Sequence, residues 1–220
     1  MTLKAVAFDV DGTLYSNASM IWRSLPLALA NSRLLKALEK ARIELHNHPQ
    51  HLPDVHKTQA EIVAKLLGVT LDTARSRIEK TVYTDWYKLF HNLKPYPGLS
   101  TLLGRLKTEG FKLAVMSDFS IRGRLAALGL EEWWDLVFSS EEIGWLKPHP
   151  EPFLHIAQSF GLPPEQVLYV GNSVTYDVVG AYAAGMPCAH LGRSSGASTA
   201  ALSFRNYRDL EAFLFPRGLP

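Results

Sequence analysis

Hydrophobic and polar positions fall into two alternating patterns along most of this chain. Short apolar runs that end in polar residues or glycine predict strands, and they cover residues 4–8, 111–116, 136–138, 166–170 and 187–191. Apolar residues spaced three or four apart predict helices, and they cover residues 99–106, 120–128, 152–160 and 177–184. Each helical run is followed by a glycine, a common helix stop. Repeated units of this kind predict an α/β fold with a parallel sheet covered by helices on both faces.

Residues 20–93 depart from this alternation. Helical patterns cover residues 21–45, 61–67 and 73–90, without a convincing strand. The segment Pro95-Tyr96-Pro97-Gly98 then marks a return to the strand and helix alternation. We therefore expect a helical domain over residues 16–94, inserted into a core built from residues 1–15 and 95–220. Near the end of the chain, residues 192–198 form a small polar segment that we expect to be a mobile loop.

Composition narrows the class of protein. The 220 residues are 47% hydrophobic and 20% charged, which is ordinary for a globular chain. The net charge of +2, without a long basic run, gives no indication of nucleic acid or a membrane surface as partner. No stretch reaches the ~18 apolar residues of a membrane span, and the first residues become charged too soon for a signal peptide. We expect a cytoplasmic enzyme or binding protein, monomeric or homodimeric.

The cysteine and the clustered histidines give no indication of a disulfide or a metal site. Cys188 is the only cysteine, so an internal disulfide is excluded, and its apolar neighbours predict a core position. Four histidines cluster in a segment interrupted by two prolines, which suits no single helical face; they are His46, His48, His51 and His56. We expect a solvated loop there rather than a metal site.

Two aspartates, one residue apart, follow the first predicted strand in Asp9-Val10-Asp11-Gly12-Thr13-Leu14. Alternate side chains of a strand share a face, so an extended chain would place Asp9 and Asp11 on the same side. Two like charges that close need a cation, or one must take up a proton. Mg²⁺ supplies that charge and takes oxygen ligands at ~2.1 Å. The alternative is a surface turn, since Asp-Gly is a common turn dipeptide.

Further polar residues follow the other predicted strands: Ser117 and Asp118 after the second, Asn172 and Asp177 after the fourth, and Lys147 before Pro148. Ligands bind at the carboxyl ends of parallel strands, so these groups are expected to converge on one edge. A carboxylate can attack phosphorus, while lysine, hydroxyl and amide groups stabilise the phosphoryl oxygens. The set predicts a phosphoryl-transfer site. Structural alternatives are a helix cap for Ser117, a solvated lysine for Lys147 and a helix-dipole charge for Asp177.

These segments resemble the four motifs of the haloacid dehalogenase-like hydrolase superfamily. The first segment resembles the DxDGT motif, and that match is highly specific. The others follow in order: Ser117 as the second motif, Lys147-Pro148 within a KPxPxxF run as the third, and Gly171-Asn172-Ser173 to Asp177 as the fourth. The resemblance covers residues 1–14 and about 95–215, and it implies a Rossmann-like core. The helical insertion corresponds in position to the mobile α-helical cap domain of that superfamily.

The resemblance implies a role for each matching residue. Asp9 would be the nucleophile and a metal ligand, and Asp11 the general acid and base with its backbone carbonyl on the metal. Ser117 and Lys147 would hold the phosphoryl oxygens, and Asp118 is a further candidate for substrate binding. Asn172 and Asp177 would complete the Mg²⁺ site. The cap residues Arg23, Arg33, Arg42 and the Trp22 region could meet substrate, although arginines on helix surfaces are usually solvated.

Asn172 departs from the superfamily pattern, because the fourth motif usually reads GDxxxxD with an aspartate at this position. An amide oxygen can bind Mg²⁺ but brings no charge, so weaker metal binding is expected. The leading hypothesis is a Mg²⁺-dependent phosphatase that acts on a small soluble phosphomonoester through an aspartyl-phosphate. A hydrolytic dehalogenase is less favoured because of Asp11. A phosphomutase of the β-phosphoglucomutase type and a non-catalytic phosphate-binding protein stay open, and the sequence does not reveal the substrate.

Overall fold

Six parallel strands form one sheet in the computed structural model, which describes residues 2–91, 93–121, 123–193 and 199–216. The strands are β1 (Ala5–Asp9), β2 (Lys112–Ser117), β3 (Leu136–Ser139), β4 (Val167–Gly171), β5 (Cys188–Leu191) and β6 (Leu202–Phe204). Their order is β3-β2-β1-β4-β5-β6, so β1 lies between β2 and β4. Asp9 pairs with Met116 in register, and Phe8 pairs with Val170. The carboxyl ends of these three strands therefore meet at one edge, as predicted for an α/β fold.

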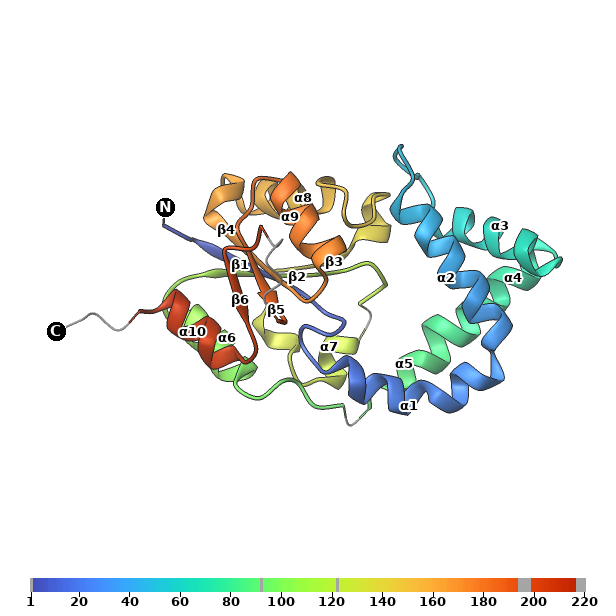
Figure 1. Ribbon diagram of the computed structural model, residues 1–220, viewed down its shortest axis with the longest axis horizontal. Helices are drawn as coiled ribbons and strands as arrows, with labels where there is room; N and C mark the ends of the chain where they lie inside the picture. Colours follow the sequence, from blue (N-terminus) through green and yellow to red (C-terminus); the bar gives the residue numbers. More distant parts are fainter. Residues whose placement is uncertain (1, 92, 122, 194–198, 217–220) are drawn as a thin grey trace.

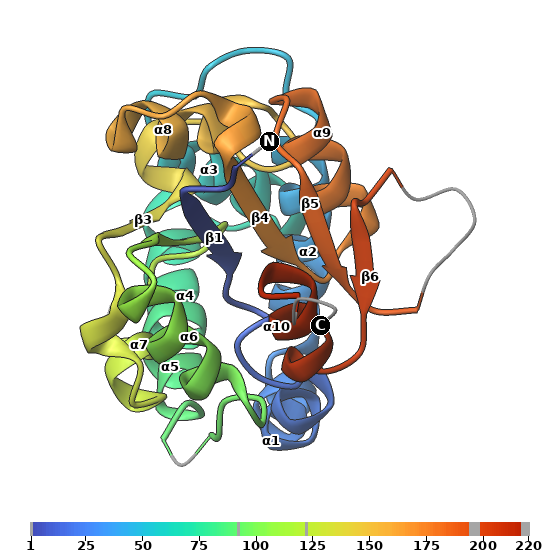
Figure 2. The ribbon, with the colours of Figure 1, turned by 90° about the vertical axis from the view of Figure 1, so that its left-hand side faces the viewer.

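Helices cover both faces of the sheet (Figure 1; Figure 2). They are α6 (Leu99–Thr108), α7 (Arg124–Ala127), α8 (Glu151–Phe160), α9 (Val179–Ala183) and α10 (Tyr207–Leu214). Val6 and Phe8 of β1 belong to the core cluster that includes residues of α6, α7 and α10. Ala5 and Ala7 belong to the cluster that includes residues of α8 and α9. Every residue of β1 is buried, because side chains alternate between two covered faces.

The helical insertion packs beside the sheet (Figure 1). It contains α1 (Asn17–Ala30), α2 (Ser32–His46), α3 (Val55–Leu67), α4 (Leu71–Ile78), the π-helical η1 (Glu79–Asp85) and α5 (Trp86–Lys88). Residues 17–91, all of which the structure describes, contain no strand. α2, α3 and α4 share an apolar cluster of their own. Tyr15 pairs with Pro95 in an antiparallel bridge, and Tyr96 N donates to Leu14 O at 2.8 Å, so the entry and exit of the insertion lie side by side.

Several elements differ from the sequence prediction. The helix predicted over residues 21–45 is broken at Asn31, whose backbone is not helical and whose side chain donates to Leu27 O. The helix predicted over 120–128 is only α7, and the one predicted over 177–184 begins as the π-helical η5 (Val174–Val178). Strand β6 was not predicted, because it is three residues long and shows no periodicity. Helix α10 was also missed, although Tyr207, Leu210 and Leu214 have helical spacing. Short 3₁₀ turns complete the fold: η2 (Glu131–Trp133), η3 (Ser140–Ile143) and η4 (Pro164–Gln166).

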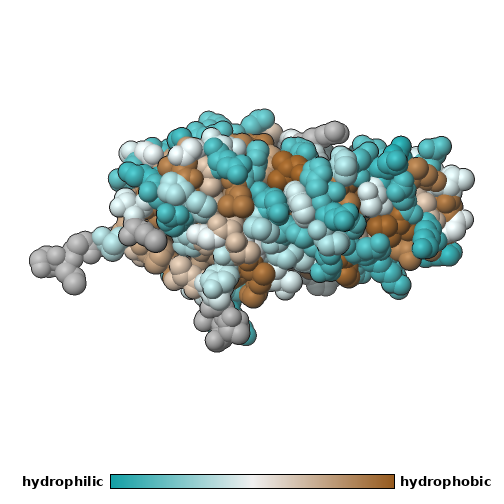
Figure 3. Space-filling model, turned by 90° about the horizontal axis from the view of Figure 1, so that it is seen from above, coloured by the Kyte–Doolittle hydropathy of each residue, from teal (hydrophilic) through white to brown (hydrophobic). Residues whose placement is uncertain are grey.

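The structure also bears on the sequence predictions about membrane spans, Cys188 and the polar loop near the end of the chain. Among the described residues, no helix combines the length and apolar character that crossing a membrane requires. On the face shown in Figure 3, hydrophilic residues surround separate apolar patches. Cys188 is buried, as predicted. The loop expected to be mobile falls mainly on residues 194–198, which lie outside the described residues.

Candidate active site

The chain turns immediately after Asp9, at the end of β1. The N–H groups of Thr13 and Leu14 both donate to Val10 O. Gly12 has a φ of +86°, and a Cβ there would lie 2.4 Å from the side-chain nitrogens of Asn17 and Asn172. Glycine thus permits both the turn and the close approach of the loop after β4.

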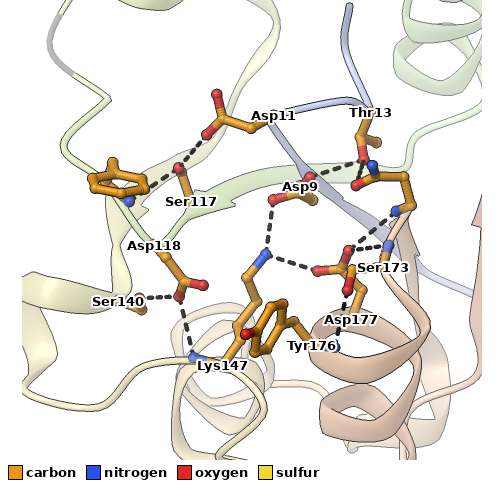
Figure 4. Close-up of polar contacts among 12 residues, drawn as sticks. Asp9, Asp11, Thr13, Ser117, Asp118, Ser140, Lys147, Ser173, Tyr176 and Asp177 are labelled. Carbon is orange, nitrogen blue, oxygen red and sulfur yellow. Dashed lines mark hydrogen bonds and ion pairs between the residues drawn. The ribbon is translucent and has the colours of Figure 1, made fainter. Parts of the chain in front are cut away.

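This turn corrects one expectation from the sequence. Asp9 and Asp11 were expected on the same side of an extended chain, but β1 ends at Asp9. Asp11 lies in the turn, and its carboxylate points toward Ser117 rather than toward the partners of Asp9 (Figure 4). The two carboxylates lie at the same sheet edge but have separate partners.

Lys147 connects Asp9 to Asp177 (Figure 4). Its Nζ donates to Asp9 Oδ1 at 2.8 Å and to Asp177 Oδ1 at 2.7 Å, and the three side chains are at most 6% exposed. Thr13 Oγ1 donates to Asp9 Oδ2 at 2.9 Å. The structure therefore brings together three of the residues that the sequence predicted, and both oxygens of Asp9 have a donor.

The charges of this group do not balance. Burial raises the pKa of Asp9 to about 7; Lys147 opposes this shift, while Asp177 and Asp11 add to it. Burial works against the charge on Lys147, but Asp177 and Asp9 outweigh it and raise the pKa of the ammonium well above its ordinary value. Lys147 therefore stays charged, and its one positive charge faces two buried carboxylates. A proton on Asp9 offsets the second negative charge below about pH 7, and a cation could take the place of that proton.

Asp11 belongs to a second group, centred on Arg124. Arg124 Nη1 donates to both Asp11 oxygens at 2.9 Å, Ser117 Oγ donates to Asp11 Oδ2 at 3.0 Å, and Tyr15 Oη donates to Asp11 Oδ1 at 2.5 Å. Arg124 Nη2 also donates to Ser117 Oγ at 2.8 Å. Burial would raise the pKa of Asp11, but Arg124, Tyr15 and Ser117 outweigh it and hold that pKa below its ordinary value.

Sequence analysis missed Arg124. It lies on α7, in the helical pattern that follows the second strand, and it is 6% exposed. The usable signal was an arginine seven residues beyond the strand-terminal Ser117, on a helix that leaves the same sheet edge. Ser117 itself, predicted to hold phosphoryl oxygens, is engaged by Arg124 and Asp11.

Asp118, predicted to bind substrate, contacts the loop that carries Lys147. Its Oδ1 accepts from Ser140 Oγ at 2.5 Å and from Lys147 N at 3.1 Å (Figure 4). Burial works against its charge, but Lys147, His46 and Arg42 outweigh burial and lower the pKa of Asp118. In this arrangement the carboxylate fixes the position of Lys147 through the backbone.

His46 corrects the prediction of a solvated histidine loop. It is 9% exposed at the end of α2, its Nδ1 contacts Lys147 O, and its ring stacks on Tyr176. Burial is the main cause that lowers its pKa, so the neutral form is favoured. Of the other three histidines of the cluster, His51 and His56 are exposed and His48 is half-buried. His46 thus packs the helical insertion against the loop that carries Lys147.

The loop after β4 places oxygen atoms beside Asp9. Asp177 Oδ2 accepts from the N–H groups of Asn172 and Ser173 at 3.1 and 2.9 Å. Thr13 Oγ1 lies 2.9 Å from Asp9 Oδ2 and 3.4 Å from Asn172 Oδ1, so these two oxygens face the same hydroxyl. Within the described ranges, no three acidic, histidine or cysteine side chains form a metal-binding group, because Asp11 turns to Arg124 and Asp177 to Lys147. The carboxylate and amide oxygens nevertheless suit Mg²⁺ in chemistry.

Comparison with known proteins identifies the family. The model of the haloacid dehalogenase-like hydrolases matches residues 3–185. A glyceraldehyde 3-phosphate phosphatase of Methanopyrus kandleri is 32% identical over 207 residues, covering 87% of this chain and 84% of that relative. A phosphoglycolate phosphatase of Haemophilus influenzae is 29% identical, covering 88% and 86%. The structure of L-2-haloacid dehalogenase from Xanthobacter autotrophicus superposes with a TM-score of 0.70 at 20% identity, over 98% of this chain and all of that chain.

The chain belongs to the haloacid dehalogenase-like hydrolases. This confirms the family that the motifs indicated. The dehalogenase structure shows a shared fold, and its low identity carries no argument about the reaction.

Proposed function

We propose that this protein is a Mg²⁺-dependent phosphatase that hydrolyses phosphomonoesters with Asp9 as the nucleophile. The observation that carries the proposal is the buried Asp9 at the end of the central strand, fixed by Lys147 at 2.8 Å and Thr13 at 2.9 Å. A carboxylate held in this way can attack phosphorus without a large rearrangement. The phosphatases among its relatives support this reaction over dehalogenation.

The reaction has two steps. In the first, an oxygen of Asp9 bonds to phosphorus while the ester P–O bond breaks, and the leaving oxygen takes a proton from Asp11. In the second, water attacks phosphorus, Asp11 takes a proton from that water, and the Asp9–phosphorus bond breaks. The sum is ester plus water to alcohol plus phosphate.

Arg124 favours the ionised form of Asp11, which suits its role as a base in the second step. The first step needs the protonated form, so Asp11 must loosen its contact with Arg124 when substrate binds. Lys147 provides positive charge beside Asp9, where the phosphoryl oxygens arrive.

The residues that would hold Mg²⁺ are Asp9, Asn172 and the backbone carbonyl of Asp11. When bound, the ion would neutralise charge that builds up on the phosphoryl oxygens. Asp177, the other predicted ligand, could reach the ion only by releasing Lys147 or the two amides that it now accepts from. With its present contacts, Asp177 fixes the position of Lys147 and of the loop that carries Asn172.

The test is release of phosphate from phenyl phosphate with and without Mg²⁺. We expect Mg²⁺-dependent release that is abolished in Asp9→Asn and retained in Asp72→Asn, an exposed aspartate in the first turn of α4. Acid-quenched enzyme should carry a phosphoryl group on the peptide that contains Asp9. Equal release by wild type and Asp9→Asn would refute the nucleophile, and chloride release from 2-chloropropionate without metal would instead support a dehalogenase.

A further inference from the structure

A cavity of about 430 Å³ lies between the helical insertion and the sheet edge. On the core side it is bordered by Asp11, Phe119 and Arg124, which follow β1 and β2. On the other side it is bordered by residues of α1, α2, η1 and α5. The cavity therefore opens from the proposed acid and base, on the side where a leaving group would lie. Its volume falls in the range of sites for drug-sized ligands and exceeds what a two-carbon acid requires.

The lining of this cavity is mainly apolar and aromatic. The helical insertion contributes Met20, Ile21, Leu35, Val82 and Trp86, among others. Burying apolar ligand surface against such side chains is favourable by about 25 cal/mol per Å². The cavity thus favours a mainly apolar organic group, with the uncharged polar side chains of Asn17, Ser24 and Ser120 as further contacts.

Arg42 lines the cavity but has its charge compensated inside the protein. Its Nη1 pairs with Glu141 Oε1 at 2.6 Å, and the Glu141 side chain is completely buried. Its Nη2 donates to Asp118 O at 2.7 Å, and its guanidinium lies over the Phe119 ring. Sequence analysis left Arg42 as a possible substrate contact or a solvated arginine, and the structure shows it buried.

Arg124 is the other cationic side chain in the described lining, and Asp11 compensates its charge. The lining also contains Glu39, an exposed acid. The Nε atoms of Arg42 and Arg124 are themselves buried, so neither presents a free donor to the cavity. A second anionic group on the substrate would find no uncompensated positive charge among the lining residues.

We propose that the physiological substrate is a phosphomonoester of a bulky, apolar alcohol that carries no second charge. This inference rests on the proposed function, because it assigns the cavity beside Asp11 to the leaving group. Specificity resides in the apolar lining from α1, α2 and η1. The phosphoryl group is held at Asp9 and Lys147 whatever the alcohol is.

The test compares kcat/KM for alkyl phosphates that share one type of leaving oxygen. Extending ethyl phosphate to hexyl phosphate should raise kcat/KM by about tenfold or more, since each buried methylene contributes about 0.8 kcal/mol. Ending the same chain in a carboxylate, as in 6-phosphooxyhexanoate, should remove that gain. Phosphoglycolate should be a poor substrate.

A matched pair of variants locates the effect. Ile21 lines the cavity and is 63% exposed, while Leu29, on the same helix and 71% exposed, does not line it. Ile21→Lys should lower the preference for hexyl phosphate over 6-phosphooxyhexanoate by about fivefold or more, because lysine adds a free positive charge there. Leu29→Lys should leave the preference unchanged.

Two failures can be told apart. If phosphate is released in an Asp9-dependent way but 6-phosphooxyhexanoate or phosphoglycolate is the best substrate, the substrate class is wrong and the phosphatase stands. If no ester releases phosphate in the presence of Mg²⁺, the proposed function fails and this inference fails with it. Equal effects of Ile21→Lys and Leu29→Lys would also overturn the assignment of the cavity.

Discussion

Arg124 donates from one nitrogen to both carboxylate oxygens of Asp11, at 2.9 Å each. The pair links α7 to the turn after β1 and directs Asp11 away from the partners of Asp9. In the proposed reaction Asp11 donates a proton in the first step and accepts one in the second. Its contact with Arg124 therefore controls the balance between protonated and ionised Asp11. This pair gives the first prediction.

Replacing Arg124 with glutamine should raise the pKa of Asp11, because Arg124 contributes the largest of the interactions that lower it. The measurement is a ¹³C NMR titration of the aspartate carboxyl carbons, with the Asp11 signal assigned from Asp11→Asn. Arg105→Gln is the control, since Arg105 pairs with Glu211. An unchanged Asp11 titration in Arg124→Gln would contradict the role given to this pair.

Stability without Mg²⁺ should depend on pH through Asp9. Its pKa is about 7 in the folded protein, above the ordinary value of 3.8. Between these values the folded state holds a proton that the unfolded chain has released, so the free energy of unfolding decreases as pH rises through that window. Urea unfolding with a chelator at about pH 5 and pH 7.5 should show this decrease.

Asp9→Asn removes the titrating group, so that variant should show a smaller loss of stability over the same pH range. Asp72→Asn should behave as wild type, because the exposed Asp72 lies away from the site. The assignment fails if Asp9→Asn loses as much stability as wild type does.

Asn172→Asp should lower the Mg²⁺ concentration needed for half-maximal activity. Asn172 Oδ1 and Asp9 Oδ2 face the same Thr13 hydroxyl, and a carboxylate at position 172 adds ligand charge there. The measurement is phosphate release against Mg²⁺ concentration for both proteins. Activation at the same or a higher concentration in the variant would show that Asn172 does not limit metal binding.

The sequence identifies the site residues that stand out by their local position, such as those at the end of a strand. Asp9 and Lys147 were identified because a polar residue after an apolar run, or a lysine before a proline, stands out locally. The parallel sheet and the helical insertion were predicted because their patterns repeat over many residues. Strand β6 lacks that repetition.

The remaining site residues depend on contacts between distant segments. Arg42 meets Glu141, and His46 meets Lys147, only because α2 packs against the loop after β3. Their helical spacing from Leu38, one step of four residues for Arg42 and two for His46, places both on the buried face of α2, but it does not identify their partners. In the same way, the direction of Asp11 is set by Arg124 and Tyr15, so spacing along the chain predicted its presence at the sheet edge but not its orientation.

The central place of β1 links the site to global unfolding. Its backbone amides are bonded within a sheet that has neighbours on both sides, so their exchange with deuterium should require the most extensive openings of the molecule. Local fraying at the sheet margins would leave Asp9 in place. Displacing the backbone that carries Asp9 would therefore require an opening of that extent.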